Sequence, residues 1–257
     1  WILQTHHGWI PTQMTATLKP IIDEVTLTEI AASAPPAKEK EPIGLKEVAT
    51  NFRKCLDITK SLGMISEGTN AWLKLCTTAN RIHHHCSVAT VTHRCAHRNP
   101  NLAQCKSDEE FRKLFTATPG QIMVGADLSG IELRLLGHYL GRYSNTFTET
   151  LLNGDIHQVN ADKVGVSRRA IKTITYAFIY GAGNQKIGTS YDPLLSEAQA
   201  KKKGKEIREA FVGGIDGLSE LLEAIKEASK KGYIKSIDGR HIKVDSPHKS
   251  LNMLLQS

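Results

Sequence analysis

The chain has 257 residues, of which 33 are lysine or arginine and 26 are aspartate or glutamate, so its formal net charge is +7 at pH 7. This length suits one large or two small domains with an ample core, and the positive charge suits a partner that carries phosphates. No apolar run approaches the roughly 18 residues of a membrane-spanning helix, so we expect a cytoplasmic protein with no membrane partner.

The first hundred residues favour packing elements and loops over a site. Residues 1–30 mix short apolar runs with prolines, and residues 31–42 are small, charged and proline-containing, which indicates a linker or exposed loop. From Leu45 the apolar residues recur at helical intervals, and a second helix is predicted around Trp72.

Cysteine and histidine residues gather between residues 83 and 105. The five cysteines of the chain are an odd number, which excludes a complete set of intrachain disulfides. Thiolate and imidazole are the ligands that zinc prefers, but the spacing follows no compact C-x₂-C pattern. Zinc is therefore the minor alternative, and the segment is interpreted as a loop around Asn99-Pro100.

The stretch QIMVGADLSGIELR, residues 121–134, predicts an apolar strand at 122–124, then Asp127, then a helix from about Ile131. A carboxylate at the end of a buried strand is well placed to bind Mg²⁺, which phosphoryl-transfer sites hold through one or two carboxylates and the substrate phosphates. The alternative is that Asp127 is an ordinary helix N-cap.

The stretch RRAIKTITYAFIYG, residues 168–181, predicts a helix with two cations and two aromatics on one face. Arg168, Lys172, Tyr176 and Tyr180 recur every four residues, which at about 100° per residue places them along one stripe. Such a face can hold a triphosphate at its basic end and stack a base or sugar at its aromatic end. The alternative is an amphipathic helix whose cations are simply solvated.

Further helices and a hairpin follow. Residues 196–211 predict a helix whose basic side chains we interpret as a solvated face, with DNA contact as the alternative. These side chains are Lys201, Lys202, Lys203, Lys205 and Arg208. Residues 215–231 predict another amphipathic helix, and residues 233–244 predict a hairpin around an Asp-Gly pair. Asn252 and Gln256 share one face of a closing helix.

These stretches together resemble the polymerase domain of family A (Pol I-like) DNA polymerases, especially the replicative enzymes of phages. VGADLSGIELR resembles motif A, RRAIKTITYAFIYGAG resembles motif B on the O helix of the fingers, and LLNGDIH lies between them. The resemblance extends upstream to HRCAHRNPNLAQ and downstream to DGRHIKVDSPHKSLNMLLQS, in the family's order. It implies a helix-rich α+β fold: a right-hand polymerase fragment with partial palm, helical fingers and a remnant of the thumb.

The resemblance also implies a division of the chain into five parts. These are a thumb or palm remnant with a linker at 1–44, helices and a DNA-contacting loop at 45–120, palm with motif A at 121–150, fingers with the O helix at 151–214, and a helix, hairpin and truncated helix at 215–257. The sequence contains no His-Asp-Glu triplet, which carries the second metal-binding carboxylate in motif C of the family. We therefore expect a fragment that does not polymerise alone and whose partner would be a C-terminal polymerase fragment.

Catalytic and nucleotide-binding roles follow from the same resemblance. Asp127, with the backbone carbonyl of Leu128, would bind two Mg²⁺ ions, although the second carboxylate ligand is absent from the chain. Arg168, Lys172 and His157 would contact the triphosphate, and Lys172 would act as general acid toward pyrophosphate. On bare chemistry, a lone histidine such as His157 is more often simply hydrogen-bonded in place.

Sugar selection and the base-pair pocket would involve Glu132 and the two tyrosines. Glu132 resembles the family glutamate that leaves no room for a ribose 2′-hydroxyl, with Tyr176 as its neighbour in that role. Tyr176 and Tyr180 would shape the base-pair pocket. The alternative for Glu132 is an i,i+2 partner of Arg134, or a surface residue, on the same helix.

DNA contacts would come from Arg94, Asn252 and Gln256. Arg94 matches a family arginine that contacts primer and template, although His93 and Ala96 replace the usual glycine and threonine around it. A solvated surface arginine is the alternative. Asn252 and Gln256 match side chains that touch the minor groove, where such contacts test the shape of a base pair without reading its sequence.

The implied function is template-directed DNA synthesis in replication, with primer-template DNA and deoxynucleoside triphosphates as partners and a two-metal-ion mechanism. One alternative is a non-catalytic DNA-binding subunit of a split polymerase. Another is a single-subunit phage RNA polymerase, against which Glu132 argues, because an enzyme that uses ribonucleotides should not block the 2′-hydroxyl.

Overall fold

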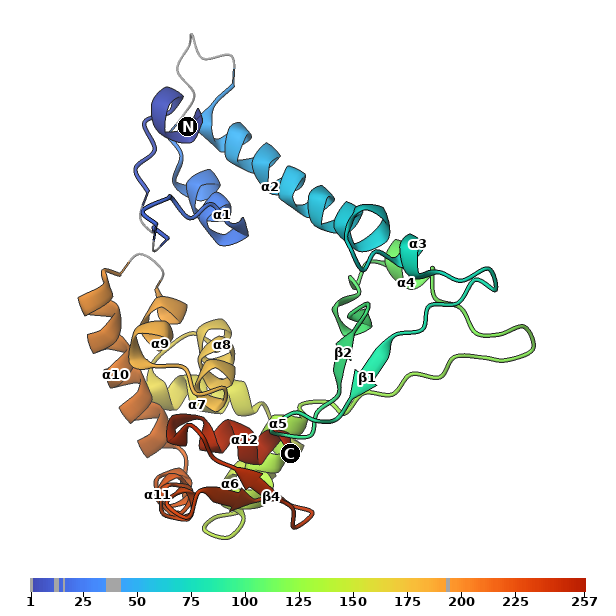
Figure 1. The fold of residues 1–257 in the computed structure, drawn as a ribbon. Coiled ribbons are helices and arrows are strands. Elements are labelled where there is room, and N and C mark those ends of the chain that lie inside the picture. Colours follow the sequence, from blue (N-terminus) through green and yellow to red (C-terminus); the bar gives the residue numbers. More distant parts are fainter. Residues whose placement is uncertain (1, 12–13, 16, 36–42, 193–194) are drawn as a thin grey trace. The chain divides into compact units, whose positions relative to one another are not determined.

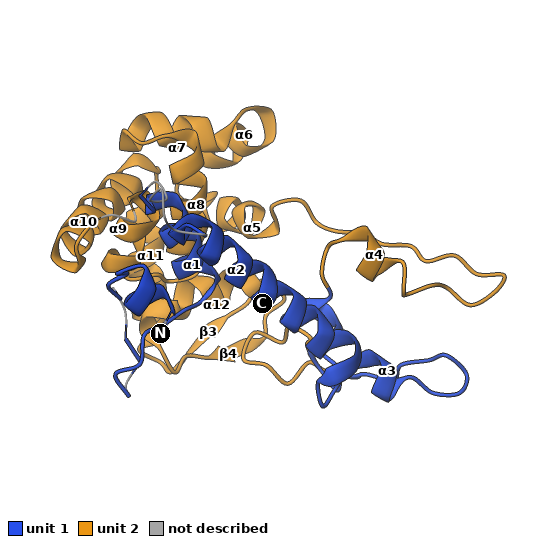
Figure 2. Cartoon of the chain, turned by 90° about the horizontal axis from the view of Figure 1, so that it is seen from above, with its two compact units in different colours: residues 1–86, 97–105 blue, residues 87–96, 106–257 orange. Residues whose placement is uncertain are grey.

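A computed structural model describes residues 2–11, 14–15, 17–35, 43–192 and 195–257. The chain forms two compact units (Figure 2): residues 1–86 and 97–105 make up unit 1, and residues 87–96 and 106–257 make up unit 2. Helices predominate in the described ranges, and the named strands there form two sheets of two strands each. No described helix combines the length and the apolar character that crossing a membrane requires.

Unit 1 is built around the helices α1 (Glu24–Ser33) and α2 (Leu45–Leu62). The Asp23 carboxylate caps α1 by accepting a hydrogen bond from the Thr26 backbone N–H at 2.8 Å. The small core of the unit draws on α1 and on the first turns of α2. The predicted linker begins later than expected because α1 continues to Ser33, and residues 36–42 lie outside the described residues.

The predicted helix from Leu45 is confirmed, but most of its apolar residues do not pack. Ala49 is buried, whereas Phe52, Leu56 and Ile58 are exposed. The core cluster of unit 1 includes only the first turns of this helix, so the rest of its apolar stripe is uncovered within the unit. The second predicted helix, α3 (Trp72–Leu75), is confirmed as a single turn.

The cysteine- and histidine-rich segment contains two short paired strands, β1 (His85–Ser87) and β2 (Ala96–Arg98). A 3₁₀ turn (Leu102–Gln104) and the helix α4 (Glu109–Arg112) follow. Among the described residues, no group of three or more His, Cys, Asp or Glu side chains is arranged to hold a metal ion, so the zinc alternative gains no support.

Besides α4, unit 2 contains the helices α5 to α12 and the second hairpin (Figure 1). Its elements are α5 (Ile131–Leu140), α6 (Thr146–Asn153), α7 (Ile156–Val164), α8 (Arg168–Ile179), α9 (Asn184–Tyr191), α10 (Glu197–Gly214), α11 (Leu218–Ser229), β3 (Tyr233–Lys235), β4 (His241–Lys243) and α12 (Ser250–Gln256). The helices predicted from Ile131 onward, the hairpin and the closing helix are thereby confirmed.

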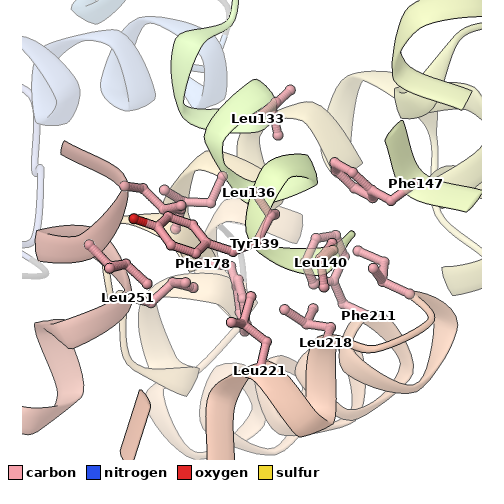
Figure 3. Close-up of a cluster of buried hydrophobic side chains, with 14 of the residues drawn as sticks. Leu133, Leu136, Tyr139, Leu140, Phe147, Phe178, Phe211, Leu218, Leu221 and Leu251 are labelled. Atoms are coloured by element: carbon pink, nitrogen blue, oxygen red, sulfur yellow. The ribbon is translucent and has the colours of Figure 1, made fainter. Parts of the chain in front are cut away.

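One apolar core joins these elements (Figure 3). Side chains of α5, α8, α10, α11 and α12 converge on it, including Leu136, Phe178, Phe211, Leu218 and Leu251. Each comes from a helix whose apolar residues recur at helical spacing, so burial of one face per helix explains the arrangement. The aromatic rings of Phe178 and Phe211 lie 5.0 Å apart, which ties α8 to α10.

Local signals fix where these helices begin. Asp155 accepts hydrogen bonds from two backbone N–H groups at the start of α7, and the Ser167 hydroxyl accepts one at the start of α8. Ser196 and Gln199 form a capping box on α10. In the hairpin, Ile234 is paired with Ile242, and both are buried. The apolar residues of the alternating pattern that predicted the hairpin therefore form its buried face.

The strand predicted at residues 122–124 is wrong. No strand is assigned there, and Ile122, Met123 and Val124 are 86%, 67% and 81% exposed. Apolar residues form a strand only where another strand supplies backbone hydrogen bonds, and no strand of the described residues runs beside this segment.

Candidate functional site

The predicted stripe of α8 runs along the edge of the helix's buried face. Ile171, Ile174 and Phe178 are at most 4% exposed, so the apolar side packs inward as predicted. Arg168 and Lys172 are exposed, Tyr176 is half-buried, and Tyr180 is the residue directly after the helix. Two clusters of side chains form along this stripe, one at each end.

The first cluster surrounds the start of α8. The Nε of Arg168 donates to a carboxylate oxygen of Asp155 at 2.7 Å, and the rings of His157 and Tyr176 lie 6.3 Å apart. Lys172 is close enough for its charge to act on His157. Three residues that were predicted to contact a triphosphate therefore lie together around the start of one helix.

Electrostatics set the protonation of this cluster. Burial, followed by the positive charges of Arg168 and Lys172, lowers the pKa of His157, and Asp155 opposes the shift. The hydrogen bond from Arg168 is the largest cause of the lowered pKa of Asp155, and backbone N–H groups add to it. The imidazole is thus neutral near pH 7. Its Nδ1 is buried without a hydrogen-bond partner among the described residues, so the alternative of a simply hydrogen-bonded histidine finds no support there.

Asp155 is a site residue that sequence reasoning missed. It has two tasks, because one carboxylate oxygen caps α7 and the other accepts from Arg168. The Gly-Asp-Ile-His sequence was an available signal for the cap, since Asp directly before an apolar helix start is a preferred N-cap.

The second cluster gathers around Glu132, the second residue of α5. The Tyr180 hydroxyl donates to Glu132 Oε1 at 3.0 Å, and Nη2 of Arg94 lies 3.9 Å from the same oxygen. The Glu132 side chain is 12% exposed. Arg134 turns away and donates to the Ser129 carbonyl at 2.9 Å, so the surface-residue alternative for Glu132 is wrong.

Gln256 completes this cluster. Burial raises the pKa of Tyr180, as do the hydrogen bond to Glu132 and its charge, whereas the charge of Arg94 and a hydrogen bond with the Gln256 side chain lower it. Four residues from four separate segments of the sequence therefore meet at one place: Arg94, Glu132, Tyr180 and Gln256. The structure places Tyr180, rather than the predicted Tyr176, in contact with Glu132, because Tyr176 lies one turn earlier beside His157.

Asp127 and Leu128 belong to neither cluster. Both are exposed, and the Asp127 side chain forms no hydrogen bond or ion pair within the described part of the chain. The N-cap alternative for Asp127 is wrong, because Gly130 with φ of 59° occupies that position of α5. On α12, Asn252 is half-buried, and its Nδ2 has no partner among the described residues.

The basic helix α10 differs from its prediction at one residue. Lys201, Lys202 and Lys205 are exposed, as expected for a solvated face. Arg208 instead points inward and donates to Asn184 Oδ1 at 2.7 Å and to the Ala182 carbonyl. The reason is its place on the helix, since Arg208 lies four residues after Gly204 and three before Phe211, both of which are buried.

A helix that aligns two cations with two tyrosines, one of them hydrogen-bonded to a nearly buried glutamate, has the character of a nucleotide-binding surface. The family model for DNA polymerase family A matches residues 21–255, so the chain belongs to this family. The DNA-directed DNA polymerases of Enterobacteria phage T3 and Escherichia phage T7 are each 32% identical to it over 282 aligned positions, which cover 97% of this chain. The chain spans 38% of the length of each of these two relatives.

Similarity to a solved structure supports the fold. The POL domain of Pol1 from M. smegmatis, in complex with DNA primer-template and dNTP, superposes with a TM-score of 0.61 and 21% sequence identity. The match covers 99% of this chain and 45% of that one. The expected fold class, a helix-rich part of a right-hand polymerase, is thereby confirmed, while the five-part division of the chain stays a prediction.

Proposed function

We propose that this chain supplies the nucleotide-binding part of a DNA-directed DNA polymerase that acts in DNA replication, in a bacterial or phage-infected cytoplasm. The observation that carries the proposal is that two clusters form around the two ends of α8: His157, Arg168 and Lys172 at its start, and Tyr180 with Glu132 at its end. A deoxynucleoside triphosphate would lie along α8 between these two clusters.

The first cluster would bind the triphosphate. Asp155 engages the Nε of Arg168 and so orients the guanidinium group, whose other N–H groups are left to form bidentate contacts with phosphate oxygens. Lys172 adds a point charge and would donate a proton to the departing pyrophosphate. The neutral imidazole of His157 would donate a ring N–H to a phosphate oxygen.

The second cluster would select the sugar and contact the primer. With its side chain 12% exposed and its Oε1 already bonded to Tyr180, Glu132 leaves little room for a 2′-hydroxyl. A ribonucleotide would have to bury that hydroxyl without a suitable partner, which carries a free-energy cost. This argues against the RNA polymerase alternative. Arg94, Asn252 and Gln256 would contact primer and template.

Asp127 and the Leu128 carbonyl would hold Mg²⁺ together with the substrate phosphates, which suits a cation that is usually bound by one or two carboxylates and keeps other ligands. Bound metal would lower the pKa of the attacking primer 3′-hydroxyl and stabilise charge on the phosphates. A single carboxylate is a weak site, so we expect no primer extension by this chain alone. A C-terminal polymerase fragment would supply the second carboxylate.

Nucleotide binding tests the proposal directly. The purified chain, with a primer-template whose primer lacks a 3′-hydroxyl, would be titrated with a fluorescent deoxynucleotide that matches the template. Lys172→Ala is expected to weaken nucleotide binding about tenfold or more, because a charged hydrogen bond contributes roughly 1.5 to 3 kcal/mol. Lys201→Ala, which removes an exposed lysine of α10, is the matched control and should change binding less than twofold.

The outcomes separate the candidate functions. Nucleotide binding that is lost in Lys172→Ala and kept in Lys201→Ala supports the polymerase site. DNA binding without any nucleotide binding would instead support the non-catalytic subunit of a split polymerase. Primer extension by the isolated chain would contradict the expected need for a second fragment.

A further inference from the structure

The turn between α8 and α9, residues 180–183, is closely constrained, and we call it the joint. The helix ends with the Gly181 N–H donating to the Phe178 carbonyl and the Ala182 N–H donating to the Ala177 carbonyl, both at 2.9 Å. Gly181 has a φ of 75°, and a Cβ atom there would lie 3.0 Å from the His248 carbonyl oxygen. The helix α9 begins three residues later at Asn184. The position of the last residues of α8 therefore depends on the side chains that contact this turn.

Arg208 of α10 contacts both sides of the joint. Its guanidinium donates to the Ala182 carbonyl within the turn and to Asn184 Oδ1 at the start of α9, the second at 2.7 Å. Its Cζ atom also lies 5.3 Å from the centre of the Phe178 ring in the last turn of α8. One side chain thus ties the end of α8, the turn and the start of α9 together.

The packing of α10 against α9 explains why Arg208 reaches the joint. A Cβ atom at Gly204 would overlap the backbone carbonyl of Asn184, so only glycine allows the two helices to approach this closely. Arg208 lies four residues after Gly204, one turn further along the same face. The close approach of α10 to α9 at Gly204 therefore places the Arg208 guanidinium within reach of the turn.

The chemistry at this position favours arginine over lysine. Arg208 is half-buried, burial lowers its pKa, and within the described residues its acceptors are an amide and a backbone carbonyl rather than a carboxylate. A planar group with several fixed donors can stack on a ring and serve two acceptors at once, whereas a lysine ammonium cannot do both.

We propose that Arg208 is a positioning residue for the candidate nucleotide site: it fixes the end of α8 and thereby places the Tyr180 hydroxyl on Glu132. Tyr180 is the first residue of the joint, one residue before Gly181, and the hydrogen bonds of Arg208 go to Asn184 and Ala182 rather than to Tyr180 or Glu132. The inference deepens the proposed function, but the placement of Tyr180 is measurable without nucleotide or DNA.

The test is the ionisation of Tyr180 in the full chain, followed by carbon NMR of the ring carbon that bears the hydroxyl group. The Tyr180 resonance is the one lost in Tyr180→Phe. Burial and the hydrogen bond to Glu132 raise the pKa of Tyr180 from its ordinary value. In Arg208→Gln we expect the pKa of Tyr180 to fall toward its ordinary value, because the hydroxyl loses the hydrogen bond to Glu132 and part of its burial. Arg169→Gln, which removes an exposed arginine of α8, is the control and should leave the titration unchanged.

A folded Arg208→Gln chain with an unchanged Tyr180 titration would overturn the proposal. If the glutamine variant unfolds, Arg208→Lys, which keeps the charge and the aliphatic stem, would be measured instead. The pKa of Tyr180 is again expected to fall. Loss of the fold in both variants would assign Arg208 to the stability of the whole unit and would equally overturn a positioning role. A chain that shows the Tyr180 shift but binds no deoxynucleotide would keep this inference and lose the proposed function.

Discussion

The hydrogen bond between Tyr180 and Glu132 should make a measurable contribution to the stability of unit 2. Tyr180→Phe removes the donor at 3.0 Å and leaves the ring in place. Hydrogen bonds to charged groups contribute about 1.5 to 3 kcal/mol, but Tyr180 is 46% exposed, so water replaces part of the loss. Arg94 at 3.9 Å compensates little, because it is itself more than half exposed. We expect a loss of about 1 to 1.5 kcal/mol.

A double-mutant cycle isolates this contribution. Urea unfolding would be followed by circular dichroism for Tyr180→Phe, Glu132→Ala and the double variant, and the coupling energy is expected to be about 1 kcal/mol. Tyr191→Phe is the control, since Tyr191 is 40% exposed and its hydroxyl forms no hydrogen bond in the described part of the chain. A coupling energy below about 0.3 kcal/mol would refute the reasoning, because independent sites already add to within that margin.

Two further predictions concern pH and the backbone. The folded-state pKa of His157 is lowered, so the unfolded chain binds more protons; the stabilisation is present above the unfolded value of about 6.5 and is lost as pH falls through the folded pKa. His157→Gln should therefore flatten the decline in the urea midpoint between pH 7.5 and pH 5, and an unchanged decline would exclude His157 as its source. Gly181→Ala should destabilise the chain by about 1 to 2 kcal/mol, because Gly181 has a positive φ and a Cβ atom there would lie against the His248 carbonyl. Gly213→Ala is the control: its Cβ atom would lie in open space within α10, so this change should be neutral or stabilising by up to about 1 kcal/mol. Equal midpoints for the two glycine variants would contradict this account.

The parts of the fold that the sequence predicted correctly depend on local signals. The helices α8, α10 and α11 each have apolar residues at helical spacing, and the hairpin has strict alternation around an Asp-Gly pair. These signals act within one element. The failed strand at 122–124 needed a partner strand, which no local pattern can supply.

The candidate site was predictable as a set of residues but not as a set of contacts. The resemblance to the polymerase family singled out Glu132, Tyr180, Arg94 and Gln256 separately. Their meeting around one carboxylate depends on how α5, α8 and α12 pack, which periodicity does not determine. Arg208 was assigned to solvent because charge runs usually are solvated, and its inward direction follows from the close approach of α10 to α9 at Gly204.

The central claim is that Glu132 and the stripe on α8 form a site selective for deoxynucleotides. The most direct measurement compares the affinity of the chain and a primer-template for matched deoxy- and ribonucleoside triphosphates, in the native chain and in Glu132→Ala. We predict that the native chain prefers the deoxynucleotide by about tenfold or more and that Glu132→Ala loses most of this preference through tighter ribonucleotide binding. Equal affinities in the native chain, or a preference that survives Glu132→Ala, would contradict the account.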